Sequence, residues 1–272
     1  MTKDLEEELN NFKFSHYKNA DFDSFTDKIK QLYSRFEKIK DKRKQSRIIL
    51  EIYTLYIQVV ELLFINSHAL SISIDRFPSA LFINTPNLQK YIEENFKKTT
   101  KYSTWFLTKV IFNVSRNNED LKDRYNLYSN LLQEVSKDYL NDFDLLNAYK
   151  HGYRITAKHD KSVLSIGTNG GQHLKLNESD STIIYFSKKK IDGTQIIIEH
   201  TLNFKVGRIF GKTLFVCSLL NNIKAAALLH YKQTIRGKDI SSFSIVDKSE
   251  WADTFGGSHF KKSVFRLKKT QT

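Results

Sequence analysis

The sequence predicts an α+β protein, with an N-terminal helical bundle followed by a small antiparallel β-sheet that packs with one long helix. Three observations lead to this fold class. Residues 1–152 contain two prolines, one glycine and repeated apolar stripes with the 3.6-residue period of helices. Residues 153–272 contain nine glycines and several runs in which apolar and polar residues alternate, as in strands. The third observation is a long apolar segment after residue 205, which predicts a single long helix. We therefore expect two domains, 1–152 and 153–272.

The first half contains five or six predicted helices. Residues 21–40 place their apolar side chains on one helical face: Phe22, Phe25, Ile29, Leu32, Phe36 and Ile39. Thr85 before Pro86 predicts an N-cap followed by proline in the first helical turn. The remaining helices are expected at 101–114, 119–136 and 138–152, and Gly152 is suited to end the last one.

Residues 48–65 are long and apolar enough to be compared with a membrane span. Glu51, Gln58 and Glu61 argue against this assignment, because each glutamate costs roughly 2 to 3 kcal/mol at the centre of a bilayer. We interpret the segment as the central core helix of the bundle and expect no membrane partner.

The second half has the signature of a hairpin and one covering helix. Asp192-Gly193 separates two β-rich runs and is the strongest hairpin signal in the chain. Residues 153–167 and the turn-forming Asn169-Gly170-Gly171 predict further short strands. Residues 205–233 predict a long helix with a wide apolar face. For residues 260–269 we expect either an edge strand or an irregular tail.

Most of the net charge of +13 lies in the second half. Residues 1–152 have 23 Lys and Arg against 21 Asp and Glu, whereas residues 153–272 have 20 against nine. Such asymmetry favours a polyanionic partner such as RNA, DNA or an acidic surface, although a lysine-rich solvated surface gives the same count. The expected phosphate contacts are Lys188, Lys189, Lys190, Lys261, Lys262, Lys268 and Lys269, and the aromatic side chains among them that can stack on bases or belong to the core are Tyr185, Phe186, Trp251, Phe260 and Phe265.

Several classes of site are disfavoured by the sequence. Cys217 is the single cysteine, which excludes a disulfide within the chain and agrees with a reducing cytoplasm. The eight histidines lack metal-ligand spacing, so we expect neither a metal nor another cofactor. Residues 207–213 imitate a phosphate-binding loop but have three residues between the glycines where that loop has four. We expect Gly207 and Gly211 to permit close helix packing.

Polar side chains interrupt the apolar face of the helix expected at 138–152. At 100° per residue, Leu140, Phe143, Asn147 and His151 fall close together, with Asp144 beside them. Polar groups on a core-facing stripe need hydrogen-bond partners, because each unmet buried group costs about 1 to 3 kcal/mol. Asn147 and His151 therefore form either a catalytic site or a structural link between helix ends.

The sequence Leu146-Asn147-Ala148-Tyr149-Lys150-His151 resembles the HEPN superfamily, whose ribonucleases have Arg, usually a polar residue, three further residues and then His. The resemblance covers the helical half, with Asn147 and His151 at matching positions and Leu146 in place of the arginine. It implies metal-independent RNA cleavage, with DNA excluded by its missing 2′-hydroxyl, in a homodimer that pairs two histidine helices. The candidate catalytic residues are His151, Asn147, Lys150, Arg154 and Asp144.

Two alternatives stay open at this stage. Leu146 cannot stabilise charge on a phosphate, so the bundle can instead be a non-catalytic interaction or scaffold subunit of a multi-protein assembly, of the toxin–antitoxin or phage-defence kind. The charge alone is also compatible with a sequence-indifferent nucleic-acid-binding protein whose helical half is unrelated to HEPN.

Overall fold

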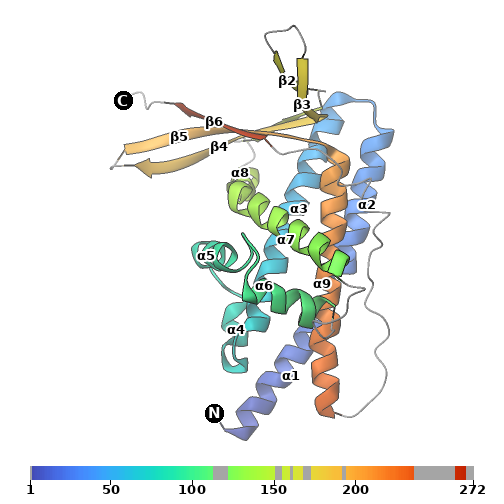
Figure 1. Ribbon diagram of the computed structural model, residues 1–272, viewed down its shortest axis with the longest axis vertical. Helices are drawn as coiled ribbons and strands as arrows, with labels where there is room; N and C mark the ends of the chain where they lie inside the picture. The colour runs from blue at the N-terminus through green and yellow to red at the C-terminus, as the bar shows by residue number, and fades with distance from the viewer. Residues whose placement is uncertain are drawn as a thin grey trace. The chain divides into compact units, whose positions relative to one another are not determined.

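The computed structural model describes residues 2–112, 122–150, 155–159, 162–167, 173–191, 194–235 and 261–267 (Figure 1). It confirms the α+β class, because helices dominate the first half and antiparallel strands follow. The predicted boundary after Gly152 lies outside the described residues. The elements of the first half, in chain order, are α1 (Lys3–Asn19), α2 (Asp23–Lys38), α3 (Lys42–Ser71), the 3-10 turn η1 (Ile74–Arg76), α4 (Phe77–Ala80), α5 (Thr85–Asn95), α6 (Lys101–Trp105), the π-helical η2 (Phe106–Ile111), α7 (Lys122–Asp142) and α8 (Asp144–Lys150).

The second half contains the predicted strands and the long helix α9 (Val206–Ile235). The strands are β1 (Ile155–Lys158), β2 (Ser162–Gly167), β3 (His173–Ser179), β4 (Ser181–Ile191), β5 (Thr194–Phe204) and β6 (Lys261–Leu267). They form a four-stranded sheet in the order β1-β4-β5-β6 and a separate pair, β2-β3. All described pairings are antiparallel, and Ile191 pairs with Thr194, which confirms the hairpin around Asp192-Gly193. β6 lies at the edge of the four-stranded sheet, which confirms the edge strand that was one of the two expectations for this segment.

The chain divides into two compact units. Unit 1 comprises residues 1–26, 58–141 and 214–248, and unit 2 comprises residues 27–57, 142–213 and 249–272. The helices α2, α3 and α9 each contribute residues to both.

The core of unit 1 combines aliphatic side chains with a small network of hydroxyl groups. Ser67 of α3 is fully buried, and its Oγ lies 3.0 Å from the Tyr91 hydroxyl and 3.2 Å from the Tyr102 hydroxyl. Tyr102 also donates to the Ser67 carbonyl at 2.9 Å. Burial is the main cause that raises the pKa of Tyr91 and of Tyr102, so both remain neutral hydrogen-bonding groups. The network thus connects α3 with α5 and α6.

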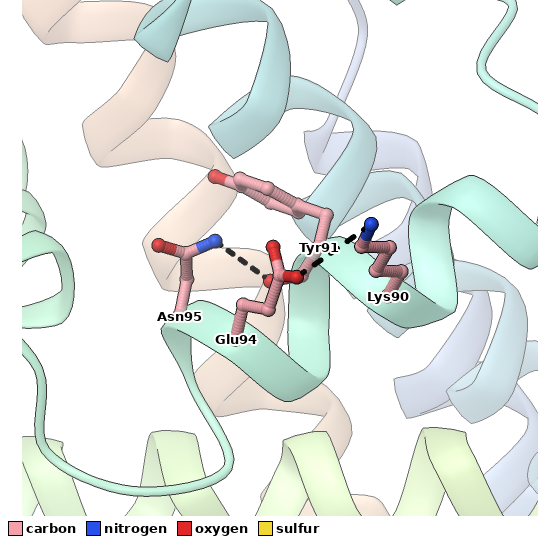
Figure 2. A network of polar contacts seen from close by, with 4 residues as sticks. All are labelled: Lys90, Tyr91, Glu94 and Asn95. Carbon is pink, nitrogen blue, oxygen red and sulfur yellow. Dashed lines mark hydrogen bonds and ion pairs between the residues drawn. The ribbon is translucent and has the colours of Figure 1, made fainter.

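Helix α5 has polar contacts between residues one turn apart, and Figure 2 shows two of them. Lys90 Nζ lies 3.9 Å from Glu94 Oε1 one turn further along, and Asn95 Nδ2 donates to the Tyr91 carbonyl at 2.9 Å. Exposed pairs of this kind add a few tenths of a kcal/mol to helix stability. The N-cap predicted at Thr85 is wrong by one residue: Asn84 is the cap and accepts a hydrogen bond from the Asn87 amide at 3.0 Å.

The helix boundary near residue 137 was also predicted incorrectly. Helix α7 continues to Asp142, and the chain turns at Phe143 before α8 begins. The Phe143 carbonyl accepts a hydrogen bond from the Leu146 amide at 3.1 Å. Leu140 and Asn147 consequently belong to different helices, so the single stripe drawn through residues 140–151 does not exist as one helical face.

Unit 2 is built around one buried face of the four-stranded sheet. The buried positions alternate along β4 and β5, as expected for strands with one face in the core: Ser181, Ile183, Tyr185, Ile198, His200, Leu202 and Phe204. Helix α9 begins directly after β5, and its first amide, Val206 N, donates to Asp180 Oδ1 at 3.0 Å. A Cβ atom at Gly207 would lie 3.3 Å from the Tyr33 hydroxyl. The predicted close packing at this glycine is therefore confirmed.

Two helices are long and apolar enough to cross a membrane by length and composition: Lys42–Ser71 and Val206–Leu229. In their most apolar windows, 67% and 61% of the residues are buried inside the protein. The segment 48–65, predicted as a core helix, lies within the first of them, and its Ile52, Val59, Val60 and Leu63 side chains are fully buried.

Candidate functional site

The short helix α8, which contains Asn147 and ends directly before His151, packs against the sheet of unit 2. It contacts β4 and β1, and its apolar side chains Leu145 and Ala148 are buried while Tyr149 is exposed. Apolar burial on one side of a seven-residue helix fixes its orientation, because so short a helix is not stable by itself. Asn147 therefore belongs to a helix that is anchored beside strand β4, and His151 is the next residue in the sequence after this helix.

The structure describes the predicted catalytic residues only in part. Asp144 is the first residue of α8 and is half-buried. Asn147 and Lys150 belong to the backbone of α8, but their side chains lie outside the described part of the chain. His151 and Arg154 also lie outside the described residues. The proximity of Asn147 to His151 thus stays a prediction from their spacing.

Leu146, which the predicted resemblance aligns with the arginine of HEPN ribonucleases, is buried, with 9% of its surface exposed. Its neighbour Leu145 is fully buried. Leu146 is therefore an apolar core residue.

A buried carboxylate just before α8 was missed by the sequence interpretation. Asp142, the last residue of α7, is 3% exposed and accepts a hydrogen bond from the Tyr53 hydroxyl at 2.9 Å. Tyr53 is fully buried, and its ring lies 4.8 Å from that of Phe204. A carboxylate in such surroundings needs hydrogen-bond donors, because removing a charge from water costs several kcal/mol.

Tyr185 links this carboxylate to the core face of the sheet. Burial raises the pKa of Tyr185 strongly, and the negative charges of Asp142 and Asp144 raise it further. Its ring stacks on the imidazole of His200 with 4.6 Å between centroids. His200 Nε2 in turn lies 2.7 Å from the Ser187 hydroxyl in a hydrogen bond. Tyr185 is thus a neutral core residue. Because it is buried, it cannot stack on the bases of a nucleic acid.

The register of the sheet separates the predicted phosphate contacts into two groups. In β4, positions 188 and 190 belong to the same face as Phe186, and position 189 belongs to the core face with Tyr185. In β6, position 261 pairs with Asn203 and position 262 pairs with the buried Leu202, so these two lysine positions also belong to opposite faces. Lys268 and Lys269, like Trp251 and Phe260, lie outside the described residues.

The segment that imitates a phosphate-binding loop is helical. Residues 207–213 lie inside α9, and Lys212 is completely buried. A phosphate-binding loop presents its backbone amides to the ligand ahead of a helix, which a segment inside a helix cannot do. The rejection of this site from glycine spacing is therefore confirmed.

Within the part of the chain that the structure describes, no three His, Cys, Asp or Glu side chains are grouped so that they could hold a metal ion. Cys217 is a buried free thiol, and burial raises its pKa to about 11, so it is a weak nucleophile. Comparisons with protein-family models, with curated proteins and with solved structures find no match for this chain.

Proposed function

We propose that this protein is a HEPN-like RNA-binding protein that cleaves RNA without a metal ion, with His151 as the group that moves the proton. The observation that carries the proposal is the packing of α8 against β4. It brings the helix that precedes His151 to the strand that also carries Lys188 and Lys190. A basic strand beside a histidine segment supplies phosphate binding and proton transfer in one unit.

The chemistry assigns a separate role to each group. His151 takes the proton of the RNA 2′-hydroxyl or gives a proton to the leaving oxygen, and the attack of the 2′-oxygen on phosphorus leaves a cyclic phosphate. Lys150 and Arg154 supply the positive charge that Leu146 cannot provide. Asn147 orients the phosphate or the imidazole, and Asp144 fixes the start of α8. A homodimer that pairs two such helices would complete the site.

Incubation of end-labelled RNA with the purified protein in EDTA tests the cleavage proposal. We expect cleavage by the parent and a loss of at least about 100-fold in rate for His151→Ala, the range typical of a general acid or base. His159→Ala is the matched control, because His159 also belongs to unit 2 and its Nδ1 lies 3.3 Å from the Ser181 hydroxyl. Equal cleavage by the parent and His151→Ala would contradict the assigned role.

The burial of Leu146 favours a second candidate, a non-catalytic scaffold subunit that binds RNA or a protein partner. In this case the parent leaves RNA intact in the same experiment, and a separate RNA-binding measurement distinguishes a scaffold that binds RNA from one that binds a protein. A toxin or phage-defence assembly is the setting proposed for either form.

A further inference from the structure

The two faces of the four-stranded sheet differ in their exposure to solvent. One face is buried in the core of unit 2. The opposite face, here called the open face, consists of the even-numbered positions of β1 and β4 and the odd-numbered positions of β5 and β6. Ile197 on the open face is 45% exposed, and Lys158 at its β1 edge is also exposed. No described position of β4 or β5 on the open face is buried.

The charges of the open face have predominantly one sign. Lysine occupies four of its described positions, and Glu199 is the one acidic residue among them. The lysine positions, one or two from each strand except β5, are Lys158, Lys188, Lys190 and Lys261. A face that combines an exposed apolar residue with this charge excess complements a partner with regularly spaced negative charges and apolar surfaces between them.

Two phenylalanines flank the centre of the open face. Phe186 of β4 and Phe265 of β6 both pair with Glu199 of β5, from opposite sides. Since neighbouring strands are about 4.8 Å apart, these two positions are separated by roughly 10 Å. A base inside a duplex is stacked on both of its faces, so a phenyl ring cannot stack on it. Bases that stack on both phenylalanine positions must therefore be unstacked, which requires a single strand.

We infer that the open face binds single-stranded RNA, with phosphates at the lysine positions and bases stacked on Phe186 and Phe265. This inference rests on the proposed function and specifies the class of RNA and the surface that binds it. It also assigns unequal roles to adjacent lysines: Lys188 and Lys261 contact RNA, whereas Lys189 and Lys262, at core-face positions, do not. Tyr185 has no part in base stacking because it is buried in the core.

Fluorescence anisotropy with a labelled uridine 12-mer, which has no secondary structure, tests the inference on the full-length protein. The variant Lys188→Gln/Lys261→Gln is compared with Lys189→Gln/Lys262→Gln, which removes the same two charges from adjacent positions. We expect the first variant to bind about tenfold more weakly and its log–log salt slope to decrease by about 1.4, or 0.7 per lost phosphate contact. The second variant retains the slope of the parent.

Two single substitutions test the centre of the face. Phe186→Leu keeps an apolar side chain but removes the aromatic ring, and we expect about tenfold weaker binding. Glu199→Gln removes the one acidic group and is expected to tighten binding severalfold, a gain that misfolding cannot produce. A 12-base-pair RNA duplex should bind more weakly than the single strand, because its bases are stacked on each other and cannot stack on the phenylalanine rings.

Equal salt slopes for the two double variants, together with unchanged binding by Phe186→Leu, would overturn the inference while leaving RNA binding by the protein intact. Failure of the parent to bind the 12-mer at low salt would overturn the proposed function as well. The two failures are thus distinguished by the behaviour of the parent protein.

Discussion

The substitution Asp142→Ala is expected to lower the free energy of unfolding by about 3 kcal/mol. Asp142 is 3% exposed and accepts a hydrogen bond from the fully buried Tyr53 across 89 residues of sequence. Alanine removes this acceptor and leaves a void beside two tyrosine rings. Tyr53→Phe keeps the ring and removes only the donor, so we expect a smaller loss of about 1 to 2 kcal/mol. Urea denaturation at pH 7 measures both effects.

Asp144→Ala is the matched control for this experiment. Asp144 lies two residues away and is half-buried, so its replacement should change the free energy of unfolding by at most about 1 kcal/mol. Equal stability losses for Asp142→Ala and Asp144→Ala would show that the Asp142–Tyr53 hydrogen bond contributes no more to stability than the contacts of the half-buried Asp144 do.

The second large effect is expected for Leu146→Arg, which introduces the arginine that the proposed HEPN resemblance would place at this position. Leu146 is 9% exposed and belongs to the apolar side of α8 with Leu145. A guanidinium group at this position is removed from water without an assigned partner, so we expect a loss of about 2 to 4 kcal/mol in the free energy of unfolding. Thermal and urea denaturation measure this loss directly.

Tyr149→Arg introduces the same side chain at an exposed position of the same helix, where 38% of the residue surface is accessible. Its effect on stability should stay within about 0.5 kcal/mol. If Leu146→Arg were as stable as Tyr149→Arg, the site could accommodate an arginine, and the interpretation of Leu146 as a core residue would be wrong.

Local sequence signals predicted the elements whose formation depends on neighbouring residues. The hairpin at Asp192-Gly193 follows from turn chemistry, and α9 follows from an unbroken apolar helical pattern. The same reasoning failed at Asn84 and at Phe143, because several cap residues adjoin α5 and the pattern of residues 119–152 has no glycine or proline before Gly152. When two adjacent residues can both act as the N-cap, the packing of the helix decides between them. A local sequence pattern does not contain this information.

The candidate site was predicted less completely than the fold. The contact of Asp142 with Tyr53 joins residues that no local pattern relates. The lysine run 188–190 was taken as one phosphate-binding group, whereas strand geometry assigns its central position to the core face. The sequence before the run, Ile183-Ile184-Tyr185-Phe186, is apolar at four successive positions, so it contains no alternation that could have assigned these lysines to opposite faces.

The measurement that tests the central claim most directly is the affinity of the parent protein for single-stranded RNA as a function of salt. RNA binding through several phosphates predicts a straight log–log plot with a fall of at least about tenfold between 50 and 200 mM salt. This result is expected whether or not His151 cleaves the RNA. No binding at 50 mM salt, or an affinity that does not change with salt, would contradict the assignment of RNA as the partner of this protein.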